Sequence, residues 1–278
     1  MKSVRVCKKV AFTPRKIGCE LLGYLVFATV RKAAAADDLR RLGLSNLIPI
    51  CPLDLTDRAQ ITAAAGRVTD ELARRGLSGL YALINNAGGG APAPVELLDL
   101  DQFQTELQAR VLGSVALVQA TLPSLRQAGG RIVWIMTPAL MPTPYVAGIH
   151  ACDFAVNCIA RTLEIELKPW DIPNIMIKCG GIKTPAGLRT TSDVEALLQT
   201  TPKARVSLYE KALRDWAGSM ADFDQKRTDP EKVAELVLKA LSARQPKRRY
   251  STGYMVKAAG FLEALPQPLV DAILKMRF

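Results

Sequence analysis

One helix-patterned stretch brings together residue types that acid–base chemistry needs. His150 is the only histidine in the 278-residue chain, and Asp153 follows it three positions later. Side chains three residues apart are neighbours on one helical face, so this carboxylate could orient the imidazole and favour its protonated form. Arg110, in an earlier helical stretch, could hold an anionic or enolate oxygen. The three residues predict proton transfer of the kind used in isomerisation, dehydration, cyclisation or retro-aldol chemistry.

Composition and charge exclude several classes of function. Apolar residues make up 49% of the chain, enough for a sizeable core, and no run of about 18 apolar residues is present to span a membrane. The formal charge of +11 includes the cluster "RQPKRR" at 244–249, but no nucleic-acid-binding motif accompanies it. Six scattered cysteines and one histidine predict no zinc site. We expect a cytoplasmic protein with a small-molecule partner and with neither nucleic acid nor membrane.

Short apolar runs alternate with amphipathic helical stretches, a pattern typical of a parallel sheet covered by helices. The predicted strands lie at 9–13, 24–30, 46–55, 80–88, 130–136 and 174–180. We therefore predict an α/β fold with a Rossmann-like, doubly wound parallel sheet in three layers, formed by one domain over 1–278. Residues 186–228 follow the sixth strand and are expected to form a substrate lid or pocket wall. Residues 229–278 are expected to form a C-terminal helical extension.

Six short strings stand in the order and spacing of one enzyme family. They are "LDLTD" (53–57), "LINNAG" (83–88), "VLGS" (111–114), "GRIVWI" (130–135), "ELKPWDI" (166–172) and "GIKTP" (181–185). Through them the chain resembles the short-chain dehydrogenase/reductase family over nearly its whole length, especially members of the retinol and 17β-hydroxysteroid dehydrogenase type. The resemblance implies NAD(P)-dependent hydride transfer between an alcohol and a carbonyl, with asparagine, serine, tyrosine and lysine as the catalytic groups.

The four catalytic positions of that family hold other residues in this chain. In the order of those groups they are Arg110, Met136 or Thr137, Ile149 and Asp153. Isoleucine has no ionisable proton and cannot act as a general acid or base. Aspartate inverts the charge that the lysine would supply, and Tyr145, a nearby hydroxyl, has no lysine at the family's spacing. We therefore predict a divergent member that lacks the catalytic tetrad and has lost NAD(P)-dependent redox catalysis.

The glycine-rich phosphate loop of the family is also altered, in "TPRKIGCELLGYLVF" at 13–27. Pro14 and Lys16 replace expected small or glycine residues, and proline removes a backbone N–H from a loop that should donate it. With the first strand at 9–13, only Cys19 to Gly23 separate Gly18 from the second strand, whereas a crossover needs about a dozen residues. The sequence thus predicts a truncated first βαβ unit and no cofactor.

Weak NADP binding is the alternative, because several residues still match cofactor-contacting positions. Arg31 with Lys32 resembles the basic pair that selects a 2′-phosphate in NADP-using relatives. The other matching positions are Asp54, Leu55, Asn85, Ala87 and Gly88. A structural role accounts for the same residues, because Asn85 and Asn86 could tie neighbouring strands together while the basic pair begins a solvated helix.

Three functions remain open. The first is a cofactor-independent isomerase, cyclase, dehydratase or lyase acting on a small hydrophobic metabolite through His150, Asp153, Arg110, Thr137 and Tyr145. The second is a catalytically silent pseudoenzyme subunit or regulatory partner, in which His150 points about 100° away from the tyrosine direction, toward solvent or a subunit contact. The third is an NADP-dependent carbonyl reductase with an unorthodox proton donor.

Assembly is predicted from two of the helical stretches. Residues 101–122 and 150–168 correspond to the helices by which relatives form dimers and tetramers, and their apolar faces suit a helix–helix interface. We expect a homodimer or homotetramer, with a hetero-oligomer containing an active relative as the alternative.

Overall fold

The computed structural model describes residues 4–8, 23–138, 142–185 and 189–277. Its seven named strands form one parallel sheet in the order β3-β2-β1-β4-β5-β6-β7. They are β1 (Val4–Lys8), β2 (Val26–Thr29), β3 (Leu47–Ile50), β4 (Leu80–Asn85), β5 (Arg131–Met136), β6 (Asn174–Cys179) and β7 (Arg249–Thr252). The order reverses between β1 and β4, as in a doubly wound sheet. The predicted α/β, Rossmann-like class is confirmed.

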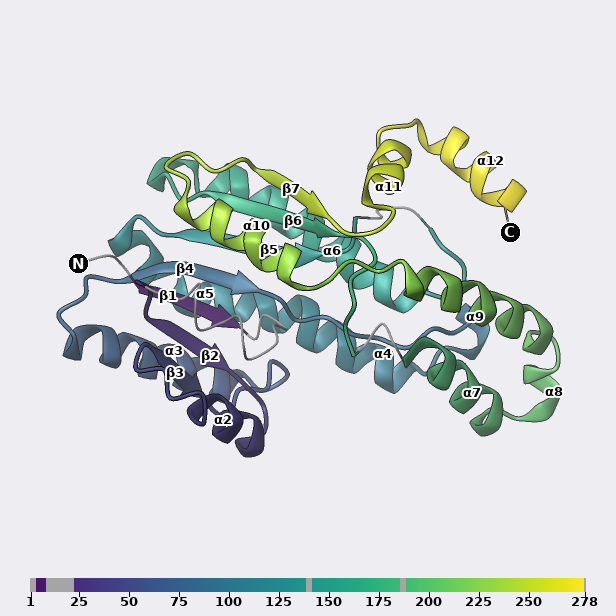
Figure 1. The fold of residues 1–278 in the computed structure, drawn as a ribbon, viewed down its shortest axis with the longest axis horizontal. Helices are drawn as coiled ribbons and strands as arrows, with labels where there is room; N and C mark the ends of the chain where they lie inside the picture. Colours follow the sequence, from purple (N-terminus) through teal and green to yellow (C-terminus); the bar gives the residue numbers. More distant parts are fainter. Residues whose placement is uncertain (1–3, 9–22, 139–141, 186–188, 278) are drawn as a thin grey trace.

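Helices cover both faces of this sheet (Figure 1). They are α2 (Ala33–Arg40), α3 (Arg58–Arg74), α4 (Leu100–Leu107), α5 (Gly113–Ala128), α6 (Ala147–Glu166), α7 (Thr190–Thr200), α8 (Lys203–Val206), α9 (Glu210–Gln225), α10 (Glu231–Ser242), α11 (Val256–Glu263) and α12 (Gln267–Arg277). A π-helical turn, Gln108–Leu112, joins α4 to α5. Among the described residues, no helix has both the length and the apolar character needed to cross a bilayer.

Alternation along the strands explains why two hydrophobic cores form. Successive side chains of a strand point to opposite faces. In β4, Leu83 therefore packs in the core that contains α3, α5 and α6, whereas its neighbours Ala82 and Ile84 pack in the core beneath α10. Nearly every side chain of β4, β5 and β6 is buried, so these strands hold the carboxyl edge of the sheet rigid.

The first strand lies elsewhere than the sequence pattern predicted. β1 is Val4–Lys8 and pairs with both β2 and β4, whereas the predicted strand at 9–13 lies outside the described residues. Residues 9–25 therefore connect β1 to β2, which is more chain than the dozen or so residues that a parallel crossover needs. The length argument for a truncated first βαβ unit is wrong, because it placed the strand too late in the sequence.

Sequence patterning also missed β7, which lies inside the expected helical extension. Its four residues alternate between exposed and half-buried, and Tyr250 packs against the core beneath α10. β7 is the last strand in the sheet order, so it pairs only with β6. Such a polar edge strand lacks the apolar run by which the other strands are recognised.

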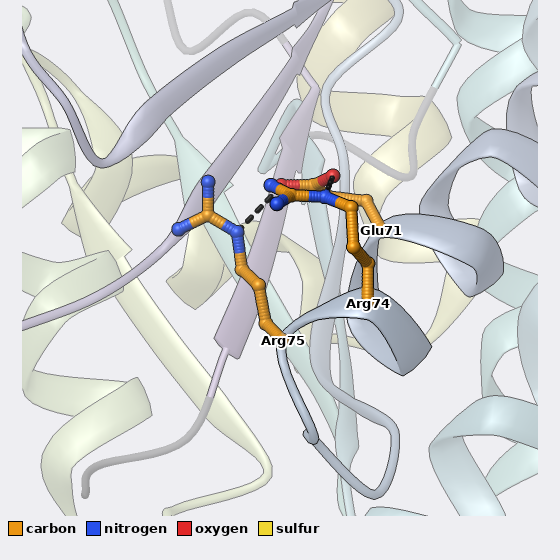
Figure 2. Close-up of polar contacts among 3 residues, drawn as sticks. All are labelled: Glu71, Arg74 and Arg75. Atoms are coloured by element: carbon orange, nitrogen blue, oxygen red, sulfur yellow. Dashed lines mark hydrogen bonds and ion pairs between the residues drawn. The ribbon is translucent and has the colours of Figure 1, made fainter.

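Side-chain hydrogen bonds stabilise both ends of α3, the helix that precedes β4. Asp57 caps the start of the helix by accepting hydrogen bonds from the backbone N–H groups of Ala59 and Gln60. In the last turn, Arg74 and Arg75 both donate to the Glu71 carboxylate (Figure 2). Hydrogen bonds from Arg74 and then Arg75 lower the pKa of Glu71 to about 2. The cluster is a surface feature at the end of α3.

Candidate active site

The carboxyl ends of β2, β3 and β4 bring the predicted nucleotide-contacting residues to one edge of the sheet. Arg31 and Lys32 follow β2, and both are exposed. Asp54 and Leu55 follow β3, the strand that pairs with β2. In open parallel sheets, ligands bind in the crevice outside these ends, where the strand order reverses.

Asp54 has the electrostatic setting of a polar anchor. Its carboxylate accepts hydrogen bonds from the backbone N–H and the hydroxyl of Thr56, each at 2.9 Å. The backbone hydrogen bond from Thr56 is the main cause that lowers the pKa of Asp54, and the positive charge of Arg31 adds to it. The basic residue after β2 and the acidic residue after β3 therefore share one electrostatic environment.

The end of β4 carries a polar group that the surrounding protein leaves unsatisfied. Asn85 is 3% exposed, and neither its side-chain nitrogen nor its oxygen has a hydrogen-bond partner among the described residues. An unsatisfied buried polar group costs about 1–3 kcal/mol. Ala87 and Gly88 follow, and a Cβ at Gly88 would meet no atom of the described residues within 4 Å. An amide with no partner among those residues, at the end of β4 where the strand order reverses, fits a hydrogen-bonding role toward a bound dinucleotide.

The catalytic positions of the resemblance meet in a buried polar cluster. Arg110 Nη2 donates to Asp153 Oδ1 at 2.9 Å, and the Thr137 hydroxyl donates to Asp153 Oδ2 at 2.9 Å. Arg110 Nη1 also donates to the carbonyls of Gly89 (3.0 Å) and Ile149 (3.2 Å). Arg110 is 7% exposed and Asp153 4%. The two charge-bearing replacements therefore complement each other as one buried ion pair.

Two other predicted residues lie around this cluster. His150 is half-buried in the first turn of α6, and its backbone N–H donates to the Val146 carbonyl. Tyr145 has a left-handed backbone (φ 66°) and packs edge-to-face on Trp216 of α9, with ring centroids 5.7 Å apart. Its carbonyl accepts a hydrogen bond from the Ala93 N–H at 2.7 Å. Tyr145 thus packs with residues of α7 and α9. These two helices lie beyond the carboxyl ends of the strands (Figure 1).

A cavity of about 580 Å³ lies between α4, the segment before it, and α7. Its walls combine apolar side chains such as Leu97, Phe103 and Leu197 with the charged groups of Glu106 and Arg205. This volume is typical of a small-molecule site. The structure therefore offers room for an organic substrate beside the carboxyl edge of the sheet.

Sequence reasoning missed Glu106, which lines this cavity. Glu106 precedes Arg110 by four residues, so the helical period that placed Arg110 could have indicated it. Burial raises the pKa of Glu106, against the lowering effects of the Arg110 charge and of hydrogen bonds from Gln102 and the Ala91 N–H. The structure thus favours the protonated carboxyl.

The raised pKa of Glu106 predicts a pH-dependent cost to stability. The pKa of Glu106 is higher in the folded protein than in the unfolded chain. The free energy of unfolding therefore falls as the pH rises from the unfolded-state pKa through the folded-state pKa. Glu106→Gln, which has no proton to lose, should be more stable than the parent at neutral pH and equal to it below about pH 4. Urea unfolding at several pH values measures the difference. A constant difference across the range would contradict the assignment.

No group of three or more His, Cys, Asp and Glu side chains within the described ranges is placed to hold a metal ion. Cys51, Cys152, Cys158 and Cys179 are free thiols.

Comparison with known proteins places this geometry in a family. Residues 17–195 match the family described as short chain dehydrogenase. Retinol dehydrogenase 5 of Mus musculus is 30% identical over 259 residues, which cover 91% of this chain and 80% of that protein. Human 17-beta-hydroxysteroid dehydrogenase type 1 is 30% identical over 202 residues, which cover 72% of this chain and 58% of that protein.

A solved short chain dehydrogenase from Burkholderia cenocepacia J2315, in complex with NADP, shares the fold. The TM-score is 0.70 at 22% sequence identity, over 98% of this chain and 97% of that one. An alcohol dehydrogenase from Thermococcus sibiricus, complexed with 5-hydroxy-NADP, gives a TM-score of 0.69 at 18% identity, over 92% of this chain and 98% of that one.

These comparisons overturn two predictions made from the sequence. The relatives are dehydrogenases and the fold neighbours include NADP complexes, which points to NAD(P)-dependent redox catalysis. The prediction of lost redox catalysis, whether as a cofactor-independent enzyme or as a silent subunit, is wrong, and so is the prediction of no cofactor. Both predictions rested on the residue types at the catalytic and phosphate-loop positions, which the family relationship outweighs. The chain belongs to the short chain dehydrogenase family.

Proposed function

We propose that the protein is an NAD(P)-dependent oxidoreductase that interconverts an alcohol and a carbonyl group on a small, largely apolar substrate. One observation carries the proposal: the ends of β2, β3 and β4 present a basic pair, an acidic anchor and the Asn85 amide at one edge of the sheet. The mixed apolar and polar cavity of about 580 Å³ supplies the substrate space. Retinol and hydroxysteroids, named in the relatives, are alcohols on apolar skeletons.

The dinucleotide, when bound, supplies or accepts the hydride. In our proposal Arg31 and Lys32 hold a 2′-phosphate, because two cations after the second strand can pair with its charge. Asp54 and Leu55 flank the adenine end, and Asn85 to Gly88 line the floor of the crevice. The orphaned Asn85 amide gains hydrogen-bond partners on binding, which offsets the cost of its burial.

We further propose that the catalytic centre diverges from the tetrad of the family. Ile149 stands at the tyrosine position and offers no proton. The Arg110–Asp153 ion pair replaces the asparagine and the lysine, and Asp153 accepts the Thr137 hydroxyl hydrogen at 2.9 Å. The proton donor must then come from another residue that lines the cavity.

Calorimetric titration of the purified protein with NADP(H) and NAD(H) tests the proposal. We expect micromolar binding of at least one dinucleotide, followed by turnover with retinol or a 17β-hydroxysteroid in the oxidising direction. Absence of binding into the millimolar range, together with no absorbance change at the nicotinamide band, would contradict it.

Cofactor preference depends on the basic pair after β2. Replacing both Arg31 and Lys32 with alanine should weaken NADP binding about 10- to 100-fold, since a charge-assisted hydrogen bond is worth about 1.5–3 kcal/mol. NAD binding should change little. Arg41→Ala, at the far end of α2 and paired with Asp38, is the matched control. Equal losses for NADP and NAD would show that the pair does not select the phosphate.

Assembly remains a proposal that rests on exposed apolar side chains. Leu112, Phe154 and Ile165, on the π-helical turn and α6, are 50%, 41% and 76% exposed. Burying such residues between subunits is favourable, so we propose a homo-oligomer through these elements. Light scattering after gel filtration should give at least a dimer, and Phe154→Asp should shift the mass toward a monomer. A monomeric parent protein would refute this interface.

A further inference from the structure

Glu106 is a titratable group in the cavity wall that none of the steps above uses. We propose that Glu106 is the proton donor in carbonyl reduction, and the acceptor in alcohol oxidation, in place of the tyrosine that Ile149 replaces. The inference rests on the proposed oxidoreductase function and names the acid–base group that function lacks.

Contacts at Gly90 place the Glu106 carboxyl beside the tyrosine position. A Cβ built on Gly90 would lie 2.8 Å from Glu106 Oε2 and 2.5 Å from Ile149 Cγ1. Glycine at this position, with φ +125°, therefore lets both side chains approach the same point of the backbone. Glu106 comes from α4 and Ile149 from α6, so the carboxyl reaches from the opposite helix to the side chain at the position where the family keeps its tyrosine.

The cavity gives this carboxyl access to a substrate. Glu106 is half-buried and lines the space of about 580 Å³ together with Phe103 and Leu98. The Ala91 N–H and the Gln102 side chain fix its orientation, the latter through a 3.4 Å contact to Oε1. A general acid must lie within hydrogen-bond reach of the atom that it protonates, and a cavity-lining carboxyl meets that need.

Burial and the charges around Glu106 together account for the direction of its raised pKa. Arg110 faces it from the same helix and, alone, would favour the carboxylate. Asp153 pairs with Arg110 and places a negative charge beside that cation, which opposes its effect on Glu106. A lysine at position 153 would add a second cation instead. The negative charge at position 153 therefore favours the protonated form of Glu106. Because Ile149 occupies the tyrosine position, no phenolate is present that would require a cation at position 153.

The other ionisable groups near Glu106 do not change this preference for the protonated carboxyl. Cys152 of α6 is fully buried, and burial raises the pKa of its thiol, so it carries no charge there. The cavity wall adds Asp99 and Asp193, which oppose ionisation of a nearby carboxyl, and Arg205, which favours it.

The proton and hydride transfers balance when Glu106 is the acid–base group. In reduction, hydride from the reduced dinucleotide forms the new C–H bond, and the electron pair of the C=O π bond moves to oxygen. That oxygen takes the proton from the Glu106 carboxyl, which becomes a carboxylate and regains a proton from water in the open cavity. In oxidation, the Glu106 carboxylate would remove the alcohol proton while the hydride passes from the carbinol carbon to the oxidised dinucleotide, and the O–H bonding pair forms the C=O π bond.

Two readouts on Glu106→Gln test the inference. Glutamine keeps the shape and the acceptor oxygen for the Ala91 N–H but carries no transferable proton. Carbonyl reduction should fall about 100-fold or more in kcat, the usual contribution of a general acid. Dinucleotide affinity by calorimetry should stay unchanged. Asp101→Asn, an exposed carboxyl on the same helix and outside the cavity, should behave as the parent protein.

Carbon-13 NMR of protein labelled at the glutamate carboxyl carbons gives a readout without substrate. The resonance missing in Glu106→Gln identifies Glu106, and we expect it to titrate above the ordinary glutamate range of about pH 4. Titration in the ordinary range, or full activity in Glu106→Gln, overturns the inference while leaving the oxidoreductase function standing. A parent protein that binds no dinucleotide and reduces no carbonyl overturns both.

Discussion

Arg110→Met is expected to lower the free energy of unfolding by about 3–5 kcal/mol, since it leaves the buried Asp153 carboxylate without its counterion. Both side chains of the pair are at most 8% exposed, so water cannot replace the lost partner. Methionine keeps most of the volume of the arginine stem, which limits any cavity contribution. Urea unfolding at neutral pH measures the loss. A cost of about 1 kcal/mol or less would mean that Asp153 does not depend on Arg110.

A double variant separates the charge from the packing. In Arg110→Met with Asp153→Asn, no charge remains unpaired, and the amide oxygen can still accept the Thr137 hydroxyl. We expect the double variant to regain half or more of the stability that Arg110→Met alone loses, because neutral replacements of a buried pair are often tolerated. Additive losses from the two single changes would instead show that the residues act independently.

Gly113→Ala is expected to cost about 2–4 kcal/mol through a backbone collision. A Cβ at this position would lie 2.2 Å from the Leu55 carbonyl oxygen and 2.7 Å from Leu55 Cβ, so helix α5 and the segment after β3 would have to move apart. Overpacking a filled core commonly costs 1–3 kcal/mol, and backbone atoms give way less readily than side chains. Thermal and urea unfolding measure the effect.

The displacement should also reach the nucleotide edge. Leu55 follows Asp54 directly, so a shift of its carbonyl moves the predicted adenine contacts, and dinucleotide affinity should fall along with stability. Gly66→Ala is the matched control: Gly66 lies within α3 and its Cβ would meet no atom within 4 Å. It should stabilise the protein by about 0.5–1 kcal/mol. Full dinucleotide affinity in Gly113→Ala would contradict the link between Gly113 and the site.

Local patterns in the sequence were sufficient for most of the architecture. Five buried strands, from β2 to β6, carry apolar runs that patterning recognises, and the structure places each inside its predicted range. The polar edge strand β7 and the position of β1 were missed. In β7 the stabilising contacts are backbone hydrogen bonds to β6, which any residue can make and which leave little trace in the residue types.

The sequence by itself determined the fold class and the family resemblance, and it predicted which positions correspond to the catalytic residues of the family. Only the tertiary structure decided what those residues do together. Arg110 and Asp153 are 43 positions apart, and in the sequence the nearest candidate partner of Asp153 was His150. Glu106 became a candidate acid–base residue only because the fold brings α4, Gly90 and α6 into contact. The physical reason is that a side chain's charge state depends on burial and on neighbours brought in by the fold, whereas periodicity records only which face of its own element it occupies.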